Sequence, residues 1–376
     1  GIIGGKAHLV NPAHCIGHGA CKTACPHDAI QLVFGTAKRG MDIPLVKPNF
    51  ETNVPGLFIA GELGGMGLIR KAAEQGRQAM ESIAKLKGAN GASLHRAPRL
   101  GPIGEGGDQS YDVVIVGAGP AGLSASLGAM EKKLRFVTIE QEDAFGGTVY
   151  HYPRNKVVMT APVQLPIVGK MNFGEVSKEM LLEFWQGVLR KTGLKINFSE
   201  RMETLKPDSK GFVVKTAKAE YRTRAVLLAI GRRGTPRKLD VPGEECAKVV
   251  YRLIDAEQYR GQHVLVVGGG DAALEAALAC SEQRGTSVTI SYRSEAFGRV
   301  KPKNRDLLQQ AQAAGRINVL LNSNVKSITP HQVILEQQKR KIELSNHAVI
   351  VCAGGVLPTP FLKEIGIQVD TKYGTV

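Results

Sequence analysis

Two copies of one glycine-rich unit constrain the fold of this chain more than any other feature of its sequence. The first copy, YDVVIVGAGPAGLSASLGAMEKKLRFVTIE, covers residues 111–140, and the second, HVLVVGGGDAALEAALACSEQRGTSVTISY, covers residues 263–292. In each copy an apolar strand leads through glycines into a helix and then into another strand, which is typical of a parallel βαβ unit. Strand-like segments at 211–216 and 225–230 separate the copies. The repeat therefore predicts an α/β protein with two nucleotide-binding domains.

The glycines of the first copy occupy the positions that a bound dinucleotide requires. Gly117 makes the tight turn after the strand, Gly119 lets a pyrophosphate approach the backbone, and Gly122 allows the helix to pack closely. The phosphates would lie at the N-terminus of this helix. Glu140 ends the second strand, where a carboxylate can accept hydrogen bonds from ribose hydroxyls. The expected contacts are Gly117, Gly119, Pro120, Ala121, Gly122 and Glu140.

The second copy differs from the first at the end of its second strand. Ser291 stands where the first copy has Glu140, so no carboxylate would repel a 2′-phosphate there. The cationic residues that follow predict a preference for NADPH over NADH. The alternative is that Arg293 is an ordinary surface residue. The residues expected at this second site are Gly268, Gly270, Asp271, Ala272, Ala273, Arg293, Arg299 and Lys301.

Together these motifs resemble the thioredoxin-reductase-like branch of the pyridine nucleotide-disulfide oxidoreductases. The resemblance covers about 41–86 and 111–376, and its matching motifs are GAGPAG at 117–122, Gly146-Gly147, Ala229-Ile230-Gly231, GGGDAA at 268–273 and Ala353-Gly354-Gly355. It implies two Rossmann-like domains, with FAD in the first, a nicotinamide nucleotide in the second and hydride transfer to flavin N5. It adds to the expected cofactor contacts Gly146, Gly147, Thr148, Gly231 and Gly354.

One segment is out of order relative to this family. Residues 52–76, TNVPGLFIAGELGGMGLIRKAAEQG, look like the strand, glycine turn and helix that close the FAD site. In the family such a segment follows the nicotinamide domain, whereas here it precedes the first fingerprint. We expect a circular permutation in which the segment closes the FAD site in cis. The alternatives are a duplicated remnant or an element that completes a neighbouring subunit.

On this interpretation the early segment supplies further cofactor contacts. Glu62 takes the place that an Asp near the ribityl chain holds in the family. Backbone amides at the start of the helix, expected near 68–85, would stabilise negative charge at flavin N1 and C2=O on reduction. The residues expected here are Gly61, Glu62, Met66, Leu68 and Ile69.

A run of metal-ligating residues near the N-terminus offers an exit for electrons. HCIGHGACKTACP, residues 14–26, matches the bacterial ferredoxin pattern Cys-x2-Cys-x2-Cys-x3-Cys-Pro, except that a histidine replaces the second cysteine. A [4Fe-4S] cluster with an imidazole ligand and a [3Fe-4S] cluster held by thiolates alone both remain open, and a zinc knuckle is the rival metal site. The expected ligands are Cys15, His18, Cys21 and Cys25.

The ferredoxin pattern also raises the question of whether the module is complete. In two-cluster ferredoxins the fourth cysteine ligates the other cluster, and the resemblance implies a second motif immediately upstream of CIGHGAC. Because the chain begins at Gly1 rather than Met, we expect a trimmed fragment. The module would then be partial, and this chain alone would bind no cluster.

The remaining cysteines do not form a dithiol motif. Thioredoxin reductases of this type carry a Cys-x-x-Cys in the nicotinamide domain, which is absent here, and a branch associated with low-molecular-weight disulfides has a cysteine where this chain has Ala121. Cys246, Cys280 and Cys352 are therefore expected to pack in the core, and direct dithiol chemistry is disfavoured. His151, which follows the Gly146-Gly147 pair, is expected either to donate a proton near the flavin or to be structural.

These segments predict six regions. The stretch 87–110 is rich in Gly and Pro without an apolar period, as in a flexible linker. The expected regions are a partial ferredoxin-like iron-sulfur segment at 1–36, the permuted closing segment at 37–86, the linker at 87–110, an FAD-binding domain at 111–240, an NADPH-binding domain at 241–357 and a return to the FAD domain at 358–376.

The net charge of +15 suits a phosphorylated cofactor together with an acidic redox protein or a small-molecule electron acceptor. Nucleic-acid binding is not expected, because the basic residues are dispersed and lack interleaved aromatics. No apolar run approaches the ~20 residues of a membrane span, and no leader opens the chain, so we expect a cytoplasmic protein, with membrane association of a longer parent left open. The resemblance implies a homodimer.

The function predicted from these features is transfer of electrons from NADPH through FAD to an iron-sulfur centre and an unknown acceptor. One alternative is a reductase of small disulfides or quinones in which the cluster is only structural. A second alternative, from another class of protein, is a redox sensor that binds FAD without turnover.

Overall fold

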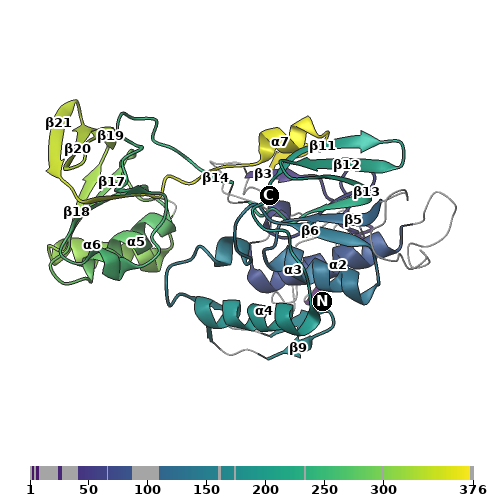
Figure 1. Ribbon diagram of the computed structural model, residues 1–376. Helices are drawn as coiled ribbons and strands as arrows, with labels where there is room; N and C mark the ends of the chain where they lie inside the picture. Colours follow the sequence, from purple (N-terminus) through teal and green to yellow (C-terminus); the bar gives the residue numbers. More distant parts are fainter. Residues whose placement is uncertain are drawn as a thin grey trace. The chain divides into compact units, whose positions relative to one another are not determined.

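The computed structural model of this chain describes residues 2–3, 6–7, 24–27, 41–65, 67–86, 110–159, 162–172, 175–232, 234–298 and 300–372. The chain forms two compact units, each of which contains one fingerprint (Figure 1). Unit 1 consists of Gly1–Tyr150, Asn155–Arg232 and Pro358–Val376, and unit 2 consists of His151–Arg154 and Arg233–Leu357. The chain therefore passes from unit 1 into unit 2 and returns to unit 1 at Pro358.

Unit 1 is built on a sheet with the strand order β11-β12-β13-β5-β6, and β4 pairs alongside β13. Parallel pairs join β13 to β4 and to β5, and β5 to β6, whereas β11, β12 and the first half of β13 form an antiparallel meander. The parallel strands are mostly apolar, as expected for strands whose two faces are both covered, although β5 includes the buried Asp112 and β6 the buried Thr138. The strands are β4 (Leu57–Ile59), β5 (Tyr111–Val116), β6 (Phe136–Ile139), β11 (Met202–Asp208), β12 (Gly211–Thr216) and β13 (Glu220–Leu228).

The sequence of β13, EYRTRAVLL, changes character where its pairing changes. Residues 220–224 alternate between exposed and buried, and residues 225–228 are all buried. The alternating half pairs with β12, where one face meets solvent, and the buried half lies between β4 and β5. The strand predicted at 225–230 therefore begins earlier, at Glu220, and ends at Leu228.

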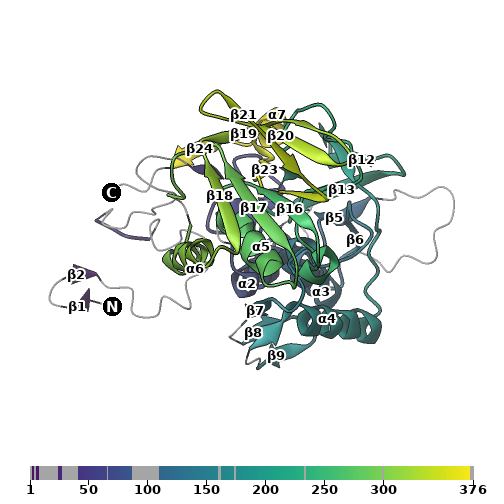
Figure 2. The same cartoon turned by 90° about the vertical axis from the view of Figure 1, so that its left-hand side faces the viewer.

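Helices α2 (Ile69–Ala84) and α3 (Pro120–Glu131) pack against each other on one face of this sheet (Figures 1 and 2). Small residues allow their backbones to approach. A Cβ added at Gly76 of α2 would lie 2.1 Å from the carbonyl oxygen of Ala121, and one added at Gly128 of α3 would lie 3.2 Å from the Met80 side chain. The close approach of the two helices thus requires glycine at position 76, whereas at position 128 the Met80 side chain leaves only a tight space for a larger residue.

The early segment lies within unit 1 although it precedes the first fingerprint in the sequence. Its elements are β3 (Met41–Pro44), β4, the 3₁₀ turn η2 (Glu62–Gly64) and α2. Strand β3 pairs antiparallel with β24 (Val369–Lys372), which follows the short helix α7 (Thr359–Glu364). Asn53 adds a second link, because its Nδ2 donates to the Gly366 carbonyl at 2.8 Å and its Oδ1 accepts from the Gln368 N–H at 2.9 Å. Residues 41–86 are therefore held by both β13 and the last part of unit 1.

Short strands and a fourth helix complete the described part of unit 1. β7 (Val157–Met159) pairs with β10 (Val176–Ser177), β8 (Val163–Leu165) pairs with β9 (Gly169–Met171), and β1 (Ile2–Ile3) pairs with β2 (Lys6–Ala7). Helix α4 (Lys178–Thr192) begins at the Ser177 cap, which accepts from the Met180 N–H, and ends at Gly193 with φ 69°. Another 3₁₀ turn, η4, covers Gly147–Val149.

Unit 2 contains a five-stranded parallel sheet in the order β15-β22-β16-β17-β18. Its strands are β15 (Val249–Val250), β16 (His263–Val267), β17 (Ser287–Tyr292), β18 (Ile317–Leu321) and β22 (Ala348–Val351). Helices α5 (Asp271–Ser281) and α6 (Pro302–Ala313) share one core with this sheet. The other elements are the turn η5 (Ala256–Tyr259), the antiparallel sheet of β19 (Ser323–Ile328), β20 (Gln332–Gln337) and β21 (Arg340–Ser345), and the pair β14 (Thr235–Pro236) and β23 (Gly355–Val356).

The two units confirm the predicted α/β class with Rossmann-like parallel sheets. The predicted helix at 68–85 spans Ile69–Ala84, a difference of one residue at each end, as is usual where helix ends fray. The partial ferredoxin-like module stays a prediction, because Cys15, His18 and Cys21 lie outside the described residues.

Candidate active site

The first fingerprint forms an open backbone cradle at the end of β5. Gly117 has φ 106°, and an added Cβ there would lie 2.5 Å from the Ala229 carbonyl oxygen. An added Cβ at Gly122 would lie 1.8 Å from the carbonyl oxygen of Gly117, so α3 starts directly against the strand end. At Gly119, by contrast, the nearest described atom would be 3.8 Å away, on Gly147. This open backbone at the second glycine is what a pyrophosphate needs.

The cradle lies at a helix start and beside the second glycine pair. No described side chain caps the N-terminus of α3, which leaves its first N–H groups for an anion. The Gly146 N–H donates to the Ala118 carbonyl at 2.8 Å, and an added Cβ at Gly147 would lie 3.1 Å from the Gly119 Cα. The structure thus brings Gly146, Gly147 and the adjoining Thr148 to the first fingerprint.

Glu140 lies on the glycine loop as its spacing predicts. Its Oε2 accepts from the Ala118 N–H at 2.6 Å, and its Oε1 accepts from the Glu142 N–H at 3.0 Å. Burial raises the pKa of this carboxyl, and the two N–H donors oppose that shift. The side chain is only 6% exposed, so it stands inside the site rather than on its rim.

The turn after β4 packs directly on the same cradle. Gly61 has φ 89°, and an added Cβ there would lie 3.0 Å from the Ala121 Cβ. The Gly61 N–H donates to Oε1 of Gln75 at 2.8 Å, and this amide is buried within α2. Gln75 was missed by sequence analysis, although a polar residue on the buried face of an apolar helix was a usable signal. Gln75 fixes the turn relative to α2.

Glu62 follows in this turn, and its carboxylate lies near the start of α2. An added Cβ at Gly67 would lie 3.2 Å from its Oε1. Burial raises the pKa of Glu62, and the charge of Arg232 opposes this shift. Helix α2 begins at Ile69 after Leu68, which is its N-cap residue and provides no side-chain hydrogen bond to the helix. Met66 lies outside the described residues.

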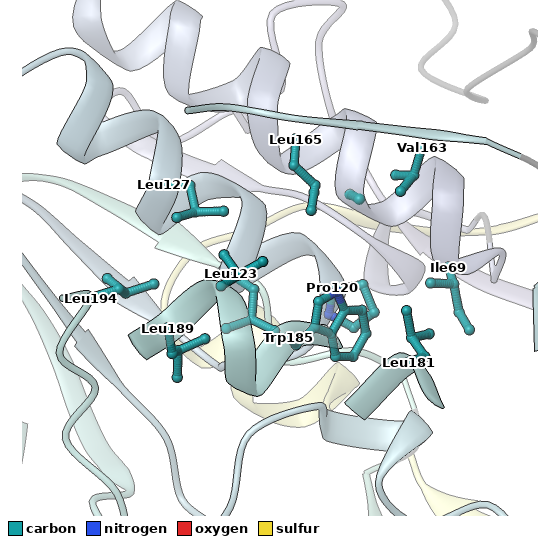
Figure 3. Close-up of a pocket in the computed structure, with 12 residues that line it drawn as sticks. Ile69, Pro120, Leu123, Leu127, Val163, Leu165, Leu181, Trp185, Leu189 and Leu194 are labelled. Atoms are coloured by element: carbon teal, nitrogen blue, oxygen red, sulfur yellow. The ribbon is translucent and has the colours of Figure 1, made fainter. Parts of the chain in front are cut away.

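An apolar cluster fixes the starts of α2 and α3 relative to α4 (Figure 3). It surrounds a cavity of about 10 Å³, which is too small to hold a cofactor. Figure 3 shows Trp185 of α4 among side chains that include Pro120 at the start of α3 and Ile69 at the start of α2. The lining is Ile69, Ala73, Pro120, Leu123, Leu127, Val163, Leu165, Leu181, Trp185, Val188, Leu189 and Leu194. The cluster is therefore packing that supports the cradle.

The second fingerprint repeats the cradle at the end of β16. Gly268 has φ 148°, and an added Cβ there would lie 2.3 Å from the Cys352 carbonyl oxygen. Gly270 has open space on its Cβ side among the described residues, and no described side chain caps α5, which begins after it. The ring of Tyr292 covers Gly269, where an added Cβ would lie 2.2 Å from a ring carbon, and it stacks on Phe297.

The residues expected to select the nucleotide have separate positions around this second cradle. The Ser291 hydroxyl lies 2.7 Å from the Ser323 hydroxyl and is buried. Arg293 is exposed, Ala272 is exposed, and Arg299 lies outside the described residues. Asp271 accepts from the Lys301 N–H at 2.9 Å and from Nδ2 of Asn304 at 2.7 Å, so its carboxylate anchors the start of α6.

The glycines that close the strands also have defined conformations. Gly231, after β13, has φ 64°, and Gly354, after β22, has φ 82°. The Gly354 carbonyl accepts from the Arg237 N–H at 2.9 Å. His151 is half-buried and belongs to the stretch His151–Arg154 that groups with unit 2, whereas Tyr150 belongs to unit 1.

The described cysteines are Cys25, Cys246, Cys280 and Cys352, and none of them forms a disulfide. Cys280 lies in the core, as expected, and burial followed by the influence of Cys352 raises the pKa of its thiol to about 12. Within the described ranges, no group of three or more His, Cys, Asp or Glu side chains could hold a metal ion. Cys15, His18 and Cys21 are outside those ranges. Among the helices that the structure describes, none is both long and apolar enough to cross a membrane.

The pKa of Cys280 leads to a direct chemical prediction. A thiol with a pKa of about 12 is almost entirely protonated at neutral pH and is a poor nucleophile. We expect iodoacetamide to leave Cys280 unmodified in the folded protein at pH 8, and to alkylate it after unfolding in guanidinium. Peptide mapping by mass spectrometry measures both states. Alkylation of Cys280 in the folded protein at pH 8 would contradict the assignment.

Comparison with known proteins places this fold. The sequence profile of the family described as "Pyridine nucleotide-disulphide oxidoreductase" matches residues 114–375. This chain belongs to that family. As a pyridine nucleotide-disulphide oxidoreductase, it is an NAD(P)H-dependent flavoprotein, and the family supports FAD and NADPH as its cofactors.

Similar members of the family include reductases with different electron acceptors in their names. Bacilliredoxin reductase Bdr of Bacillus subtilis is 26% identical over 267 residues, which are 69% of this chain and 82% of that protein. Ferredoxin–NADP reductase of Pediococcus pentosaceus is 31% identical over 229 residues, which are 60% of this chain and 63% of that protein. The structure of bacillithiol disulfide reductase Bdr from Staphylococcus aureus is 26% identical with a TM-score of 0.60, covering 70% of this chain and 85% of its own.

The two cradles fit these cofactors on structural grounds. In each cradle the first glycine stands where an added Cβ would collide with backbone, and the second glycine has open space beside it. The helix that follows has no side-chain cap at its start among the described residues. FAD, when bound, accepts a hydride from NADPH and can release its electrons one at a time. The residues of unit 1 would orient the FAD phosphates and hydroxyls, and Arg293 and Lys301 of unit 2 carry charge suited to a nucleotide phosphate.

Proposed function

We propose that this flavoprotein carries electrons from NADPH through FAD to an iron-sulfur centre in the N-terminal segment, and then to an acidic redox protein or small-molecule acceptor. The observation that carries the proposal is the position of residues 41–86 in unit 1. Strand β3 begins at Met41, and Cys25 precedes it by a stretch that could span at most roughly 55 Å. The cysteine run is thereby tethered to the unit whose cradle fits FAD.

We infer further that residues 37–86 are a permuted closing segment of the FAD-binding domain. The family match begins at residue 114 and does not include them, yet β4 pairs parallel with β13 and α2 packs on α3 of the first fingerprint. Residues 87–110 would carry the chain back to β5 as a linker. These contacts are the ones that closure in cis would require. On this proposal unit 1 contains most of the FAD-binding domain expected at 111–240, with the return at 358–376, and unit 2 contains the NADPH-binding domain expected at 241–357. The stretches 151–154 and 233–240 of the expected FAD-binding domain group with unit 2.

The proposed ligands of the iron-sulfur centre are Cys15, His18, Cys21 and Cys25. Their spacing is that of a bacterial ferredoxin run with one imidazole, which supports iron-sulfur over a zinc knuckle. The choice between [4Fe-4S] and [3Fe-4S] depends on whether His18 ligates. Electron paramagnetic resonance of the anaerobically reconstituted protein, recorded before and after reduction with dithionite, separates the two, because an oxidised [3Fe-4S] cluster gives a signal whereas a [4Fe-4S] cluster gives one only once it is reduced. Absence of any cluster signal would support the partial module instead.

A small-disulfide reductase is the second candidate, and one observation favours it. The match to bacilliredoxin reductase Bdr covers 82% of that protein, more than the match to the Pediococcus ferredoxin–NADP reductase does. Against it, position 121 of the first fingerprint is a buried alanine, and among the described thiols Cys280 is held protonated by burial. A disulfide substrate would therefore need to accept electrons directly from the flavin.

A pair of cysteine substitutions in the full chain tests the proposal. With FAD bound, we expect NADPH to bleach the flavin absorbance in stopped-flow mixing of both the wild-type protein and the Cys15→Ser/Cys21→Ser variant. Cytochrome c serves as a one-electron probe. Its rate of reduction by that variant should fall to the rate measured for wild-type protein that contains FAD but no reconstituted cluster. Cys246→Ser is the matched control, because it removes a thiol of unit 2.

The outcomes separate the candidates. If NADPH fails to bleach the flavin, or bleaches it only slowly, the proposed electron path is wrong and a redox sensor becomes the better interpretation. If the cysteine variant reduces cytochrome c as fast as wild type, the cluster is structural. Retained turnover with a low-molecular-weight disulfide would then identify the small-disulfide reductase.

A further inference from the structure

The early segment and the strand-end loop of unit 1 meet at Arg232, the last residue before the chain leaves this unit. Its Nη2 donates to the backbone carbonyl of Asp42 at 2.9 Å, a contact between residues 190 positions apart in the sequence. The guanidinium is therefore held at the strand β3 rather than directed freely into solvent. The chain between these two residues includes the whole first fingerprint, so only the folded unit creates this contact.

Asp42 is itself fixed by the part of the chain that returns from unit 2. Its Oδ1 accepts from the Thr371 hydroxyl at 2.9 Å, and its Oδ2 accepts from the Thr359 hydroxyl at 3.3 Å. Thr371 is also its partner in the pairing of β3 with β24. The carbonyl that receives Arg232 is thus held by a strand pair and two side-chain hydrogen bonds.

Strand β3 also packs on the turn η2, which contains Glu62. Glu62 belongs to the turn that adjoins the dinucleotide cradle, because the backbone of the preceding Gly61 lies against Ala121 of the first fingerprint. There it can accept hydrogen bonds from hydroxyl groups of a bound dinucleotide, and it does so more strongly when ionised. Burial works against ionisation, and a fixed cation nearby would favour it.

We propose that Arg232 is a positioning residue of the FAD site: anchored on the Asp42 carbonyl, it holds its positive charge next to the turn η2 that carries Glu62. The inference rests on FAD binding to unit 1, and it assigns a role to a residue outside both fingerprints. It also gives β3 a role beyond its pairing with β24, because this strand carries the carbonyl that anchors Arg232.

Several charged groups lie on the described elements that flank Glu62. β3 carries Asp42, the strand-end loop carries Arg232, and the first turn of α2 carries Arg70 and Lys71. Among the described residues, Arg232 is the one whose charge lowers the pKa of Glu62, whereas burial raises it. Glu140, the other carboxylate of the cradle, is shifted by burial and by its own backbone donors instead.

The test is the pH dependence of FAD affinity, measured by quenching of flavin fluorescence from pH 5 to pH 8 on the full chain. As pH falls, protonation of Glu62 weakens FAD binding. Removing the cation in Arg232→Met raises the pKa of Glu62 further, so the loss of affinity moves to higher pH. At pH 6 we expect FAD to bind to Arg232→Met about tenfold more weakly than to the wild-type protein, which is the effect of losing one charge-assisted hydrogen bond.

Three further variants make the result specific. Arg232→Lys keeps the charge and should shift the pH midpoint less than Arg232→Met. Arg224→Met removes an exposed arginine from β13 by the same substitution and should leave the midpoint unchanged. In a Glu62→Gln background the remaining pH dependence comes from Glu140, and Arg232→Met should not move it.

Two results would overturn the proposal. If Arg232→Met lowers the melting temperature but leaves the pH midpoint of FAD binding in place, Arg232 is only structural. If the shift persists in the Glu62→Gln background, the charge acts on another group. Failure of wild-type protein to bind FAD at any pH would overturn the proposed function as well, whereas an unmoved midpoint in protein that binds FAD and is bleached by NADPH overturns this inference alone.

Discussion

Gly76→Ala should disrupt unit 1 and abolish FAD binding. The added methyl group would lie 2.1 Å from the carbonyl oxygen of Ala121 and 2.9 Å from its carbonyl carbon, both backbone atoms of the first fingerprint. Helix α2 would have to move away from α3, and overpacking of this kind costs about 3 kcal/mol or more. The gain in helix propensity from Gly to Ala, about 1 kcal/mol, offsets only part of that cost. Thermal unfolding followed by circular dichroism measures the stability, and flavin fluorescence measures FAD affinity.

Gly187→Ala is the matched control for this substitution. Gly187 is also a helical glycine of unit 1, but no described atom lies within 4 Å of its added Cβ. The same change should therefore stabilise the protein by about 0.5–1 kcal/mol, since alanine loses less backbone entropy in a helix. Opposite signs at the two glycines would support the packing of α2 on α3. A Gly76→Ala variant that binds FAD normally would show that this packing is wrong.

Arg293→Ala should selectively weaken the use of NADPH. Arg293 follows the strand β17 and is exposed, and the position that carries an acid in the first fingerprint is the buried Ser291 in the second. Loss of a charged hydrogen bond to the 2′-phosphate should raise the KM for NADPH about 10- to 100-fold. The KM for NADH, which lacks that phosphate, should not change. Steady-state kinetics with both nucleotides measures the ratio.

Arg260→Ala controls for the loss of positive charge from unit 2. Arg260 follows the turn η5, and its side chain is 62% exposed. Its Nη2 lies 3.9 Å from Oε1 of Glu257. Its removal should leave both KM values unchanged. Equal losses with NADPH and NADH in Arg293→Ala would indicate that the arginine does not distinguish the nucleotides, and Arg293 would then be an ordinary surface residue.

Local sequence patterns predicted the two cradles well because their geometry depends on adjacent residues. The turn at Gly117, the open backbone at Gly119 and the close helix start at Gly122 follow from the absence of a Cβ at each position. The strand at 57–59 and the helix at 69–84 were likewise predictable, since a short apolar run and a helical apolar period are local signals.

Contacts between distant segments could not be predicted in this way. The hydrogen bond from Arg232 to Asp42 depends on how β3 and the end of β13 meet in the fold, and no spacing in the sequence encodes it. Asp271 was expected at the nucleotide, and its hydrogen bonds to Lys301 and Asn304 across α5 and α6 emerge only from helix packing. The doubled arginine at 232–233 after a strand-closing glycine was the available signal for Arg232.

The pairing of β3 with β24 has a consequence for gene fusion. Lys372, in the last described strand, lies opposite Met41, and β4 and α2 follow Met41 into the sheet. A short turn that joined these two ends, together with a new start within 87–110, would preserve every described strand pair that unit 1 forms within residues 41–372. A partner domain fused upstream of Met41 is therefore attached beside β24. In the rearranged gene, a domain fused upstream would instead be attached at the start of β5. The order of the gene, and not the fold, decides which edge of the flavoprotein a newly acquired domain meets.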